Sequence, residues 1–315
     1  MSAPVGARDA SLPADGAVEE SHDVRRLPIR LPVDGGAVSG AVIIPAHNEA
    51  AVIARTLKSL GALSDAPQLE IIVVCNGCTD DTAEVARRMP GVTVLETTEA
   101  SKTAALNHGD AFASRWPRLY LDADIDISPS AVLAVFDELR SPGVDAARPR
   151  YVYDTSSASR PVQAYYRARS RIPAPPLRLW GAGGYAVSES GHRRFSEFPQ
   201  VTADDSWIDT QFADHEKRIV PTLPMRVRTP RDLSGLLAVL TRQRRGQVEL
   251  GVPSTTTSRG RSLVASVRGP RSAGDMAWYV LLTAVARRRS RIALRARDRA
   301  WERDASSRPA EGVEA

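Results

Sequence analysis

The chain of 315 residues contains few cysteines and few aromatic residues. Its two cysteines, Cys75 and Cys78, lie in a single C-x-x-C segment, and aromatic residues make up 5% of the composition. Two cysteines cannot build a disulfide framework or a four-thiolate zinc site. A protein with so few cysteines is typical of a reducing compartment, so we expect a cytoplasmic location.

Long apolar runs are absent as well. The longest one, 277–286 (AWYVLLTAVA), is broken by a threonine and has about half the length that a membrane-spanning helix needs. The N-terminal segment has no apolar core of signal-peptide length. The sequence therefore argues against secretion and against a membrane-spanning helix.

Lysine is rare, whereas arginine is abundant and unevenly distributed. The net charge is +5, and 287–303 (RRRSRIALRARDRAWER) is densely basic. This segment is either a solvated basic helix or a contact for an anionic membrane face or an acidic partner. At most we expect peripheral contact with the inner membrane face. No recognition motif accompanies the arginines, so we do not expect nucleic-acid binding.

Apolar segments of strand and helix type alternate along the chain after an N-terminal tail, 1–39, which has no apolar period and is expected to be mostly disordered. Expected strands are 41–45, 71–75, 92–96 and 118–122, and expected helices are 50–60, one capped by Thr79 or Asp80, 102–113, one opened by Ser128-Pro129, 160–171, 233–246 and 275–301. This alternation predicts an α/β fold with a mostly parallel central sheet flanked by helices. In such sheets ligands bind beyond the carboxyl ends of the strands, where Pro45, Cys75 and Asp122 are expected.

The C-x-x-C segment has three interpretations. A strand ending in C-x-x-C before a helix is compatible with a redox centre, because a helix N-terminus lowers a thiol pKa. Asp80 and Asp81 add negative charge that disfavours a thiolate. Zinc would need further ligands, and none of the five histidines has ligand spacing to the cysteines. The third interpretation, small residues in a binding loop, depends on the neighbouring motifs.

Four fragments occur in order: VIIPAHNE (42–49), VVCNGCTDDT (73–82), SKTAALNHG (101–109) and YLDAD (120–124). Together they resemble the family 2 glycosyltransferases, nucleotide-sugar enzymes of the GT-A fold, and the resemblance covers 41 to about 250. It implies a GT-A catalytic domain at 40–232, with a nucleotide-binding half at 40–126 and an acceptor half at 127–232. A helical C-terminal extension, 233–315, would follow, with the basic segment and a disordered end.

The pair Asp122 and Asp124 predicts a metal site. Residues i and i+2 at a strand end point to the same side, and two carboxylates held together need a cation. Mg²⁺ or Mn²⁺ takes oxygen ligands from carboxylates and phosphates, and neutralises charge on a leaving nucleoside diphosphate. The resemblance implies that Asp122 contacts ribose or metal and that Asp124 binds the metal. Asp126 is a weaker candidate.

The resemblance also implies a donor-binding set of Pro45, Glu49, Asn76, Lys102 and Asp122. In the family's V-V-D-D-G-S-T-D-x-T fragment, cysteine and asparagine here replace the two acids and Cys78 replaces the serine. The cysteines would then be small loop residues, and Asn76, with a donor and acceptors, could pair with a uracil or guanine edge. The negative charge of Glu49 can also interact favourably with the dipole of the helix expected at 50–60. Lys102 would add a positive charge at the start of the helix expected at 102–113.

Two later segments concern the acceptor. GAGGY (181–185) resembles the family's Gly-rich acceptor-side turn, and TADDSWI (202–208) resembles its T-E-D signature. The resemblance implies that Asp205 is the general base of an inverting enzyme and that Asp204 takes the Glu position; a helix N-cap is the alternative for either. In RQRRG (242–246), arginine and glycine replace the Gln and Trp of the processive Q-x-x-R-W motif.

The interpretation that follows is a metal-dependent, inverting, non-processive glycosyltransferase. It would move one sugar from a UDP- or GDP-linked donor to a hydroxyl of a sugar, a lipid-linked acceptor or a small molecule. One alternative is a nucleotidyltransferase that makes a sugar nucleotide, although HNEAAVIAR (47–55) lacks that class's Gly-rich loop. Another is a non-catalytic nucleotide-sugar-binding or partner-binding subunit, which the intact Asp122, Asp124 and Asp205 argue against.

Overall fold

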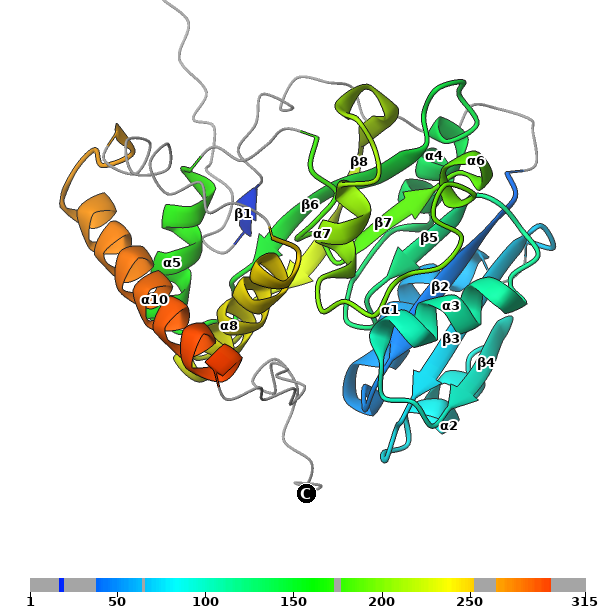
Figure 1. Cartoon of the computed structure of the whole chain (residues 1–315), viewed down its shortest axis with the longest axis horizontal. Helices are drawn as coiled ribbons and strands as arrows, with labels where there is room; N and C mark the ends of the chain where they lie inside the picture. The colour runs from blue at the N-terminus through cyan, green and yellow to red at the C-terminus, as the bar shows by residue number, and fades with distance from the viewer. Residues whose placement is uncertain (1–16, 20–37, 64–65, 173–176, 252–264, 296–315) are drawn as a thin grey trace, which may run out of the picture.

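The computed structural model describes residues 17–19, 38–63, 66–172, 177–251 and 265–295, and shows an α/β domain with a layer of helices at one side (Figure 1). Eight strands form one sheet in the order β1-β6-β7-β5-β2-β3-β4, with β8 also paired to β6. The strands are β1 (Ala17–Glu19), β2 (Gly40–Ala46), β3 (Leu69–Asn76), β4 (Val92–Thr97), β5 (Arg118–Leu121), β6 (Ala146–Asp154), β7 (Gly184–Val187) and β8 (Lys217–Arg228). The helices are α1 (Ala50–Leu60), α2 (Thr82–Arg87), α3 (Lys102–Phe112), α4 (Pro129–Glu138), α5 (Arg160–Ser170), α6 (Glu189–His192), α7 (Asp204–Asp209), α8 (Leu233–Glu249) and α10 (Pro270–Arg295), with short 3-10 turns η2 (Gly61–Leu63) and η3 (Asp214–Glu216).

The four strands expected from the sequence form one continuous parallel block of the sheet. β2 pairs in parallel with β3 and β5, and β4 pairs in parallel with β3. All of β2 is buried, and its side chains alternate between two cores: Val42 packs beneath α1, whereas Ile43 packs beneath α3. Burial of β2, of most of β3 and of β5 explains why their sequences are mostly apolar, whereas β4, at the end of the sheet, is only partly buried.

Helix α3 lies unusually close to β2 because of a glycine. A Cβ at Gly109 would lie 2.5 Å from the Ile43 Cγ2 atom, so a larger residue would push the helix away. The helix begins at Lys102 because the Ser101 side chain caps it, accepting from the Ala104 backbone N–H at 3.2 Å. Cap and glycine together fix the position of Lys102 over the carboxyl end of the sheet.

The start of α2 differs from the expectation. Its N-cap residue is Asp81 and makes no side-chain capping bond. Asp80 instead accepts from the backbone N–H groups of Thr82 and Ala50, both at 3.1 Å. One carboxylate thus serves the N-termini of α2 and α1, a relation between two loops that local sequence does not reveal.

Four strands lie outside the predicted set, and they make the sheet mixed. β7 runs antiparallel to β5 and β6, β1 runs antiparallel to β6, and β8 runs parallel to β6. GAGGY was expected only as a turn, but its last two residues open β7. β1 lies within the tail for which no regular structure is expected; the rest of 1–37 is outside the described residues. β1 and β7, with three and four residues, are too short to show a hydrophobic period in the sequence.

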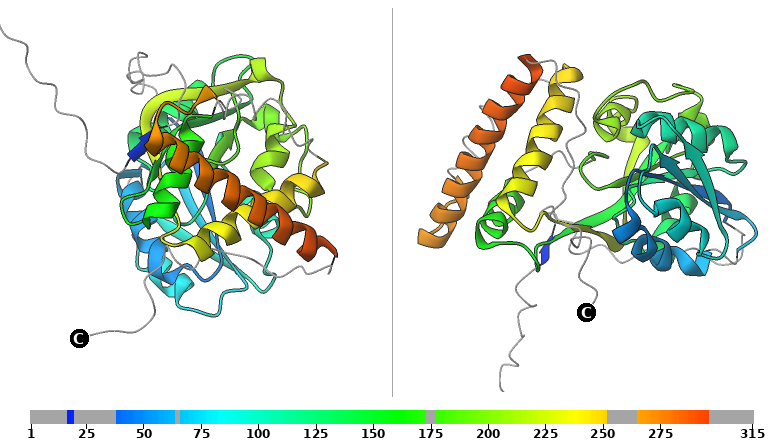
Figure 2. Two further views of the ribbon diagram at one scale, coloured as in Figure 1. Left: turned by 90° about the vertical axis from the view of Figure 1, so that its left-hand side faces the viewer. Right: turned by 90° about the horizontal axis from the view of Figure 1, so that it is seen from below.

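The C-terminal helices form a separate small core with α5, seen as the outer layer in Figure 2. Here Leu236, Leu282 and Ala286 pack together, and Asp275 of α10 pairs with Arg167 of α5 at 2.8 Å and with Arg171. α10 starts at Pro270, five residues before the expected helix, and the expected end at 301 lies outside the described residues. In the described part of the chain, no helix has the length and apolar character to cross a membrane.

Candidate active site

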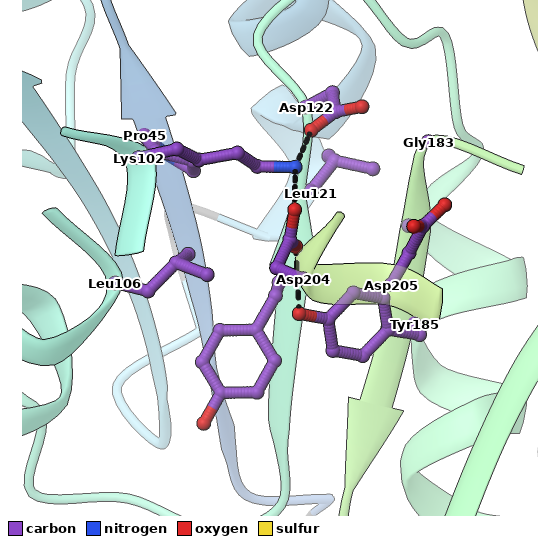
Figure 3. A pocket seen from close by; sticks show the side chains of 11 residues that line it. Pro45, Lys102, Leu106, Leu121, Asp122, Gly183, Tyr185, Asp204 and Asp205 are labelled. Atoms are coloured by element: carbon purple, nitrogen blue, oxygen red, sulfur yellow. Dashed lines mark hydrogen bonds and ion pairs between the residues drawn. The ribbon is translucent and has the colours of Figure 1, made fainter. Parts of the chain in front are cut away.

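A pocket opens at the carboxyl ends of β2 and β5, beside the start of β7 (Figure 3). The residues around it come from β2, from α3, from the end of β5, from the Gly-rich turn with the start of β7, and from α7. They are Pro45, Lys102, Leu106, Tyr120, Leu121, Asp122, Gly183, Gly184, Tyr185, Asp204 and Asp205. Four sequence-predicted site residues, Pro45, Lys102, Asp122 and Asp205, therefore meet in one place.

Lys102 lies between two carboxylates. Its Nζ atom is 2.7 Å from Asp122 Oδ1 and 2.9 Å from Asp204 Oδ1, and Figure 3 shows it reaching across the pocket between them. Burial opposes its charge, but the attraction of Asp122 and Asp204 outweighs burial and raises the pKa of Lys102 above its ordinary value. Lys102 is a permanent cation in this pocket.

Asp204 is the buried member of this group. Its side chain is 5% exposed, and its Oδ2 atom accepts from the Tyr185 hydroxyl at 2.8 Å. Burial and the charge of Asp204 raise the pKa of Tyr185, so this phenol stays protonated and donates. The sequence predicts Asp204 only as the neighbour of a base, but its packing makes it the partner that holds Lys102.

Asp205 lies on the other side of the Asp204 backbone, near Gly183 (Figure 3). Its Oδ2 atom accepts from the Gly181 N–H at 2.8 Å, and its Oδ1 atom accepts from the Ser206 N–H at 2.6 Å. Burial, followed by the charge of Asp204, raises the pKa of Asp205 above its ordinary value. A carboxylate with a raised pKa takes up a proton more readily, which suits a general base.

The Gly-rich turn reaches the pocket floor. Gly183 has φ +73°, a conformation that favours glycine, and an added Cβ would lie 2.4 Å from Ile125 Cδ1. Its carbonyl accepts from the Asp122 N–H at 2.8 Å. Glycine is thus needed both for the turn and for the space between Ile125 and Asp122.

Asp124 does not line the pocket. Its backbone carbonyl accepts from Arg55 at 3.3 Å, and Arg55 also pairs with Asp126 at 3.0 Å. Among the residues that the structure describes, no group of three or more His, Cys, Asp or Glu side chains is arranged to hold a metal ion. The assignment of Asp122 and Asp124 as metal ligands therefore stays a prediction from the sequence.

Two further predicted residues, Asn76 at the end of β3 and Glu49 before α1, lie outside the pocket lining. Asn76 ends β3, is 1% exposed, and its Nδ2 atom is buried with no hydrogen-bond acceptor among the described residues. The backbone carbonyl oxygen of Asn76 lies 2.5 Å from His47 Nδ1. Glu49 is the N-cap residue of α1, and its N–H donates to Thr82 Oγ1 at 2.7 Å.

The two cysteines join these loops. Cys78 Sγ accepts from the Asn48 N–H at 3.4 Å and donates to the Ala46 carbonyl at 3.3 Å. A hydrogen bond from the Cys75 thiol lowers the pKa of Cys78 to about 6, and this bond and burial raise the pKa of Cys75. Asp80 opposes the Cys78 thiolate as expected, but its effect is smaller than that of the bond from Cys75.

The sequence does not single out Tyr185, Tyr120 or Leu106 as site residues. Tyr185 and Tyr120 lie on adjacent strands with ring centroids 5.4 Å apart, and both line the pocket. The sequence signal for each was its place in a quoted fragment: Tyr120 in YLDAD, Leu106 in SKTAALNHG and Tyr185 in GAGGY. The pairing of β5 with β7, which brings the rings together, is not encoded locally.

Comparison with known proteins agrees with this architecture. The profile described as "Glycosyl transferase family 2" matches residues 41–192. A mannosyltransferase from Pyrobaculum calidifontis, solved with GDP-Man and Mn²⁺, is 21% identical and has a TM-score of 0.52, over 87% of this chain and 80% of that one. Glucosyl-3-phosphoglycerate synthase from Mycobacterium tuberculosis is 23% identical, with a TM-score of 0.47 over 69% of this chain and 82% of that one. Among curated proteins there is no match. Residues 41–192 therefore match the family 2 glycosyltransferase model, and the chain has the GT-A fold.

Proposed function

We propose that the protein transfers a single sugar from a nucleoside diphosphate donor to a hydroxyl acceptor, with inversion at the anomeric carbon and with a divalent cation. The observation that carries the proposal is the convergence of Lys102, Asp122 and Asp205, from three separate segments, in one pocket at the carboxyl end of the sheet. Lys102 supplies positive charge for a diphosphate, and Asp205 supplies a carboxylate with a raised pKa.

The residues present fit a divalent cation. Mg²⁺ and Mn²⁺ are commonly held by one or two carboxylates together with substrate phosphates, so a complete protein cage is not required. Asp122, whose side chain is 40% exposed, and Asp124 are the residues that would hold it. The similar mannosyltransferase was solved with Mn²⁺. When bound, the cation would neutralise charge on the leaving nucleoside diphosphate.

The nucleoside would lie beside β2 and β3. Pro45 lines the pocket, and the buried amide nitrogen of Asn76, which has no acceptor among the described residues, is a donor in need of one. A uracil or guanine carbonyl could supply that acceptor. The similar mannosyltransferase was solved with GDP-Man, which supports guanine as the first base to test.

The acceptor hydroxyl would face Asp205. A base in an inverting reaction removes the hydroxyl proton as the oxygen attacks the anomeric carbon. The backbone N–H groups of Gly181 and Ser206 hold the two Asp205 oxygens, which fixes the carboxylate orientation before the acceptor binds.

Transfer of one sugar rather than many is supported by α8. Gly246 stands where processive enzymes carry tryptophan, and its Cα packs on the loop that bears the acidic pair: an added Cβ would lie 2.5 Å from Ala203 Cβ. The indole of a tryptophan would not fit in this arrangement. This packing supports the proposal that the enzyme transfers one sugar and does not build a polymer.

A thermal-shift screen of UDP and GDP with and without Mn²⁺, followed by donor turnover, tests the proposal. Binding to the native state raises the apparent Tm by mass action. We expect a Mn²⁺-dependent shift with one nucleotide and sugar release or transfer from its sugar-linked form. Binding without any turnover would favour the non-catalytic subunit, and formation of a sugar nucleotide from a sugar phosphate and a nucleoside triphosphate would favour the nucleotidyltransferase.

A further inference from the structure

Helix α10 has two apolar faces, and only one of them is covered. Its inner face packs on α5 and α8 through buried residues such as Met276, Leu282 and Ala286. Its outward face carries Ala277, Val280, Leu281, Ala284, Arg288 and Ile292, all exposed and, apart from the adjacent pair Val280 and Leu281, spaced three or four residues apart. Such spacing places them on one side of a helix. The right panel of Figure 2 shows α10 at the outer side of the molecule, with α8 between it and the sheet, and in the left panel α10 lies toward the viewer.

The exposure of this outward face is large for apolar residues. Val280 is 51% exposed, Leu281 53% and Ile292 58%. Single exposed apolar side chains are common, but adjacent ones on a helix face indicate an interaction surface. None of these three residues belongs to the core that α10 forms with α5 and α8.

The charges around the outward face have one sign. Arg288, Arg289 and Arg291 are exposed beside its C-terminal half, and Arg271 is exposed near its start. The only acid of α10, Asp275, is buried and paired with Arg167 and Arg171. The exposed part of the described helix therefore offers arginine and apolar side chains and no carboxylate.

This combination favours a lipid surface over a second copy of the chain. A helix lying in a membrane interface buries apolar side chains among acyl chains while its arginines contact anionic headgroups. If two copies met through this face, their arginines would be brought together without acidic partners from α10, and like charges repel. The anionic headgroup supplies the complementary charge that this face lacks.

We propose that the outward face of α10 docks the protein on an anionic lipid surface, with α10 lying parallel to the surface. The interaction combines burial of Val280, Leu281 and Ile292 with attraction of the exposed arginines. It does not depend on the proposed transfer reaction, because its readout is vesicle binding.

Co-sedimentation of the full chain with vesicles tests the proposal. We expect binding to vesicles of phosphatidylglycerol and phosphatidylcholine and none to phosphatidylcholine alone. Affinity should fall at least tenfold between about 0.1 M and 1 M salt, because the screening length shortens from about 10 Å to about 3 Å. The pair Val280→Ser with Leu281→Ser, and the triple Arg288→Gln, Arg289→Gln and Arg291→Gln, should each reduce binding at least tenfold.

The matched controls make the same kinds of substitution at exposed residues outside α10. Leu223→Ser changes a leucine that is 50% exposed on β8, and Arg88→Gln, Arg115→Gln and Arg140→Gln together remove three exposed arginines from other elements. Both controls should bind vesicles like the wild type, and all variants should keep the wild-type Tm. Equal loss in the arginine control would show attraction by net charge alone and overturn the proposal. A dimer that the Val280 and Leu281 substitutions dissociate, without vesicle binding, would assign the face to a second copy and also overturn it.

Discussion

Lys102 Nζ lies 2.9 Å from Asp204 Oδ1, an ion pair between the start of α3 and the start of α7. The same ammonium is 2.7 Å from Asp122, so the pair ties the acidic loop of the acceptor side to the carboxyl end of β5. Lys102 is the positive charge that both carboxylates share. Its removal would leave the Asp204 carboxylate buried without a cationic partner. This relation motivates the first prediction.

Asp204→Asn should reduce the free energy of unfolding by about 1–3 kcal/mol, because it removes a charged partner of Lys102 from a buried site. Lys102→Met should cost a similar amount, and the double variant less than the sum, with a coupling energy of about 0.5–3 kcal/mol. Urea denaturation of the four proteins measures this, with the exposed Lys58→Met as control. Additive losses would mean that the ion pair contributes nothing to stability.

The stabilisation by Lys102 should not change through neutral pH. Its pKa is raised in the folded state, so its contribution is fully present below the pKa of lysine in the unfolded chain, about 10.4, and is lost as the pH rises through the higher folded value. The coupling energy between Lys102 and Asp204 measured at pH 6 and at pH 9 should therefore agree.

Asp205→Asn should separate transfer from donor binding. Donor affinity should stay near the wild-type value, whereas transfer should fall by roughly 10² to 10⁴, the range typical of a lost general base. Asp124→Asn should instead weaken the Mn²⁺-dependent part of donor binding, because an amide is a poorer ligand than a carboxylate. Calorimetry with nucleoside diphosphate and Mn²⁺, paired with a transfer assay, distinguishes the two.

The pH profile gives an independent check on Asp205. A base acts in its deprotonated form, so the wild-type transfer rate should rise with pH through the pKa of Asp205, which is raised above the ordinary carboxyl range. The rise should vanish in Asp205→Asn. If that variant loses donor binding as severely as Asp124→Asn, Asp205 belongs to the donor site or to the fold.

Gly246→Ala should reduce transfer and stability together. Its new methyl group would meet Ala203, the residue before Asp204, and overpacking of this kind typically costs about 1–3 kcal/mol. The matched control is Gly274→Ala on α10, where an added Cβ meets nothing within 4 Å. That change should stabilise the protein by up to about 1 kcal/mol, because glycine is a poor helix former. Equal effects of the two substitutions would exclude a packing role for Gly246.

Cys78 should react as a thiolate at mildly acidic pH. We expect iodoacetamide alkylation of Cys78 to increase with pH around a midpoint of about 6, and Cys75→Ala to move that midpoint toward about 8.5, the value of a free cysteine. Mass spectrometry of the labelled chain measures both. A wild-type midpoint near the free value would contradict the hydrogen bond between the two thiols.

The pair Cys75→Ser with Cys78→Ser should still retain most transfer activity. Serine preserves the size of both side chains, and the hydroxyl at 78 can keep the contacts with Ala46 and Asn48. Transfer assays before and after mild oxidation, on the wild type and on this variant, check the idea. Oxidative inactivation of the wild type alone would point to redox control of the nucleotide loop.

The sequence by itself determined the parallel half of the protein. Strands such as β2 and β3 are largely buried on both faces, so their apolar runs are long and continuous, and α3 and α4 begin at the capping serines Ser101 and Ser128. Apolar runs and helix caps of this kind can be recognised in the sequence without knowledge of the fold. They also placed Lys102 and Asp122 at strand or helix ends, where parallel sheets bind ligands.

Only the tertiary structure decided the other half and the charges of the site. β6, β7 and β8 owe their pairing to partners far along the chain, and β7 is too short for any period. That pairing brings Tyr185 beside Tyr120, Asp204 to Lys102 and Gly183 to Asp122. The pKa of a side chain depends on its burial and on its distance from other charges, and both are properties of the assembled fold. The raised pKa of Asp205 and the pairing of Asp204 with Lys102 therefore could not be predicted from the sequence.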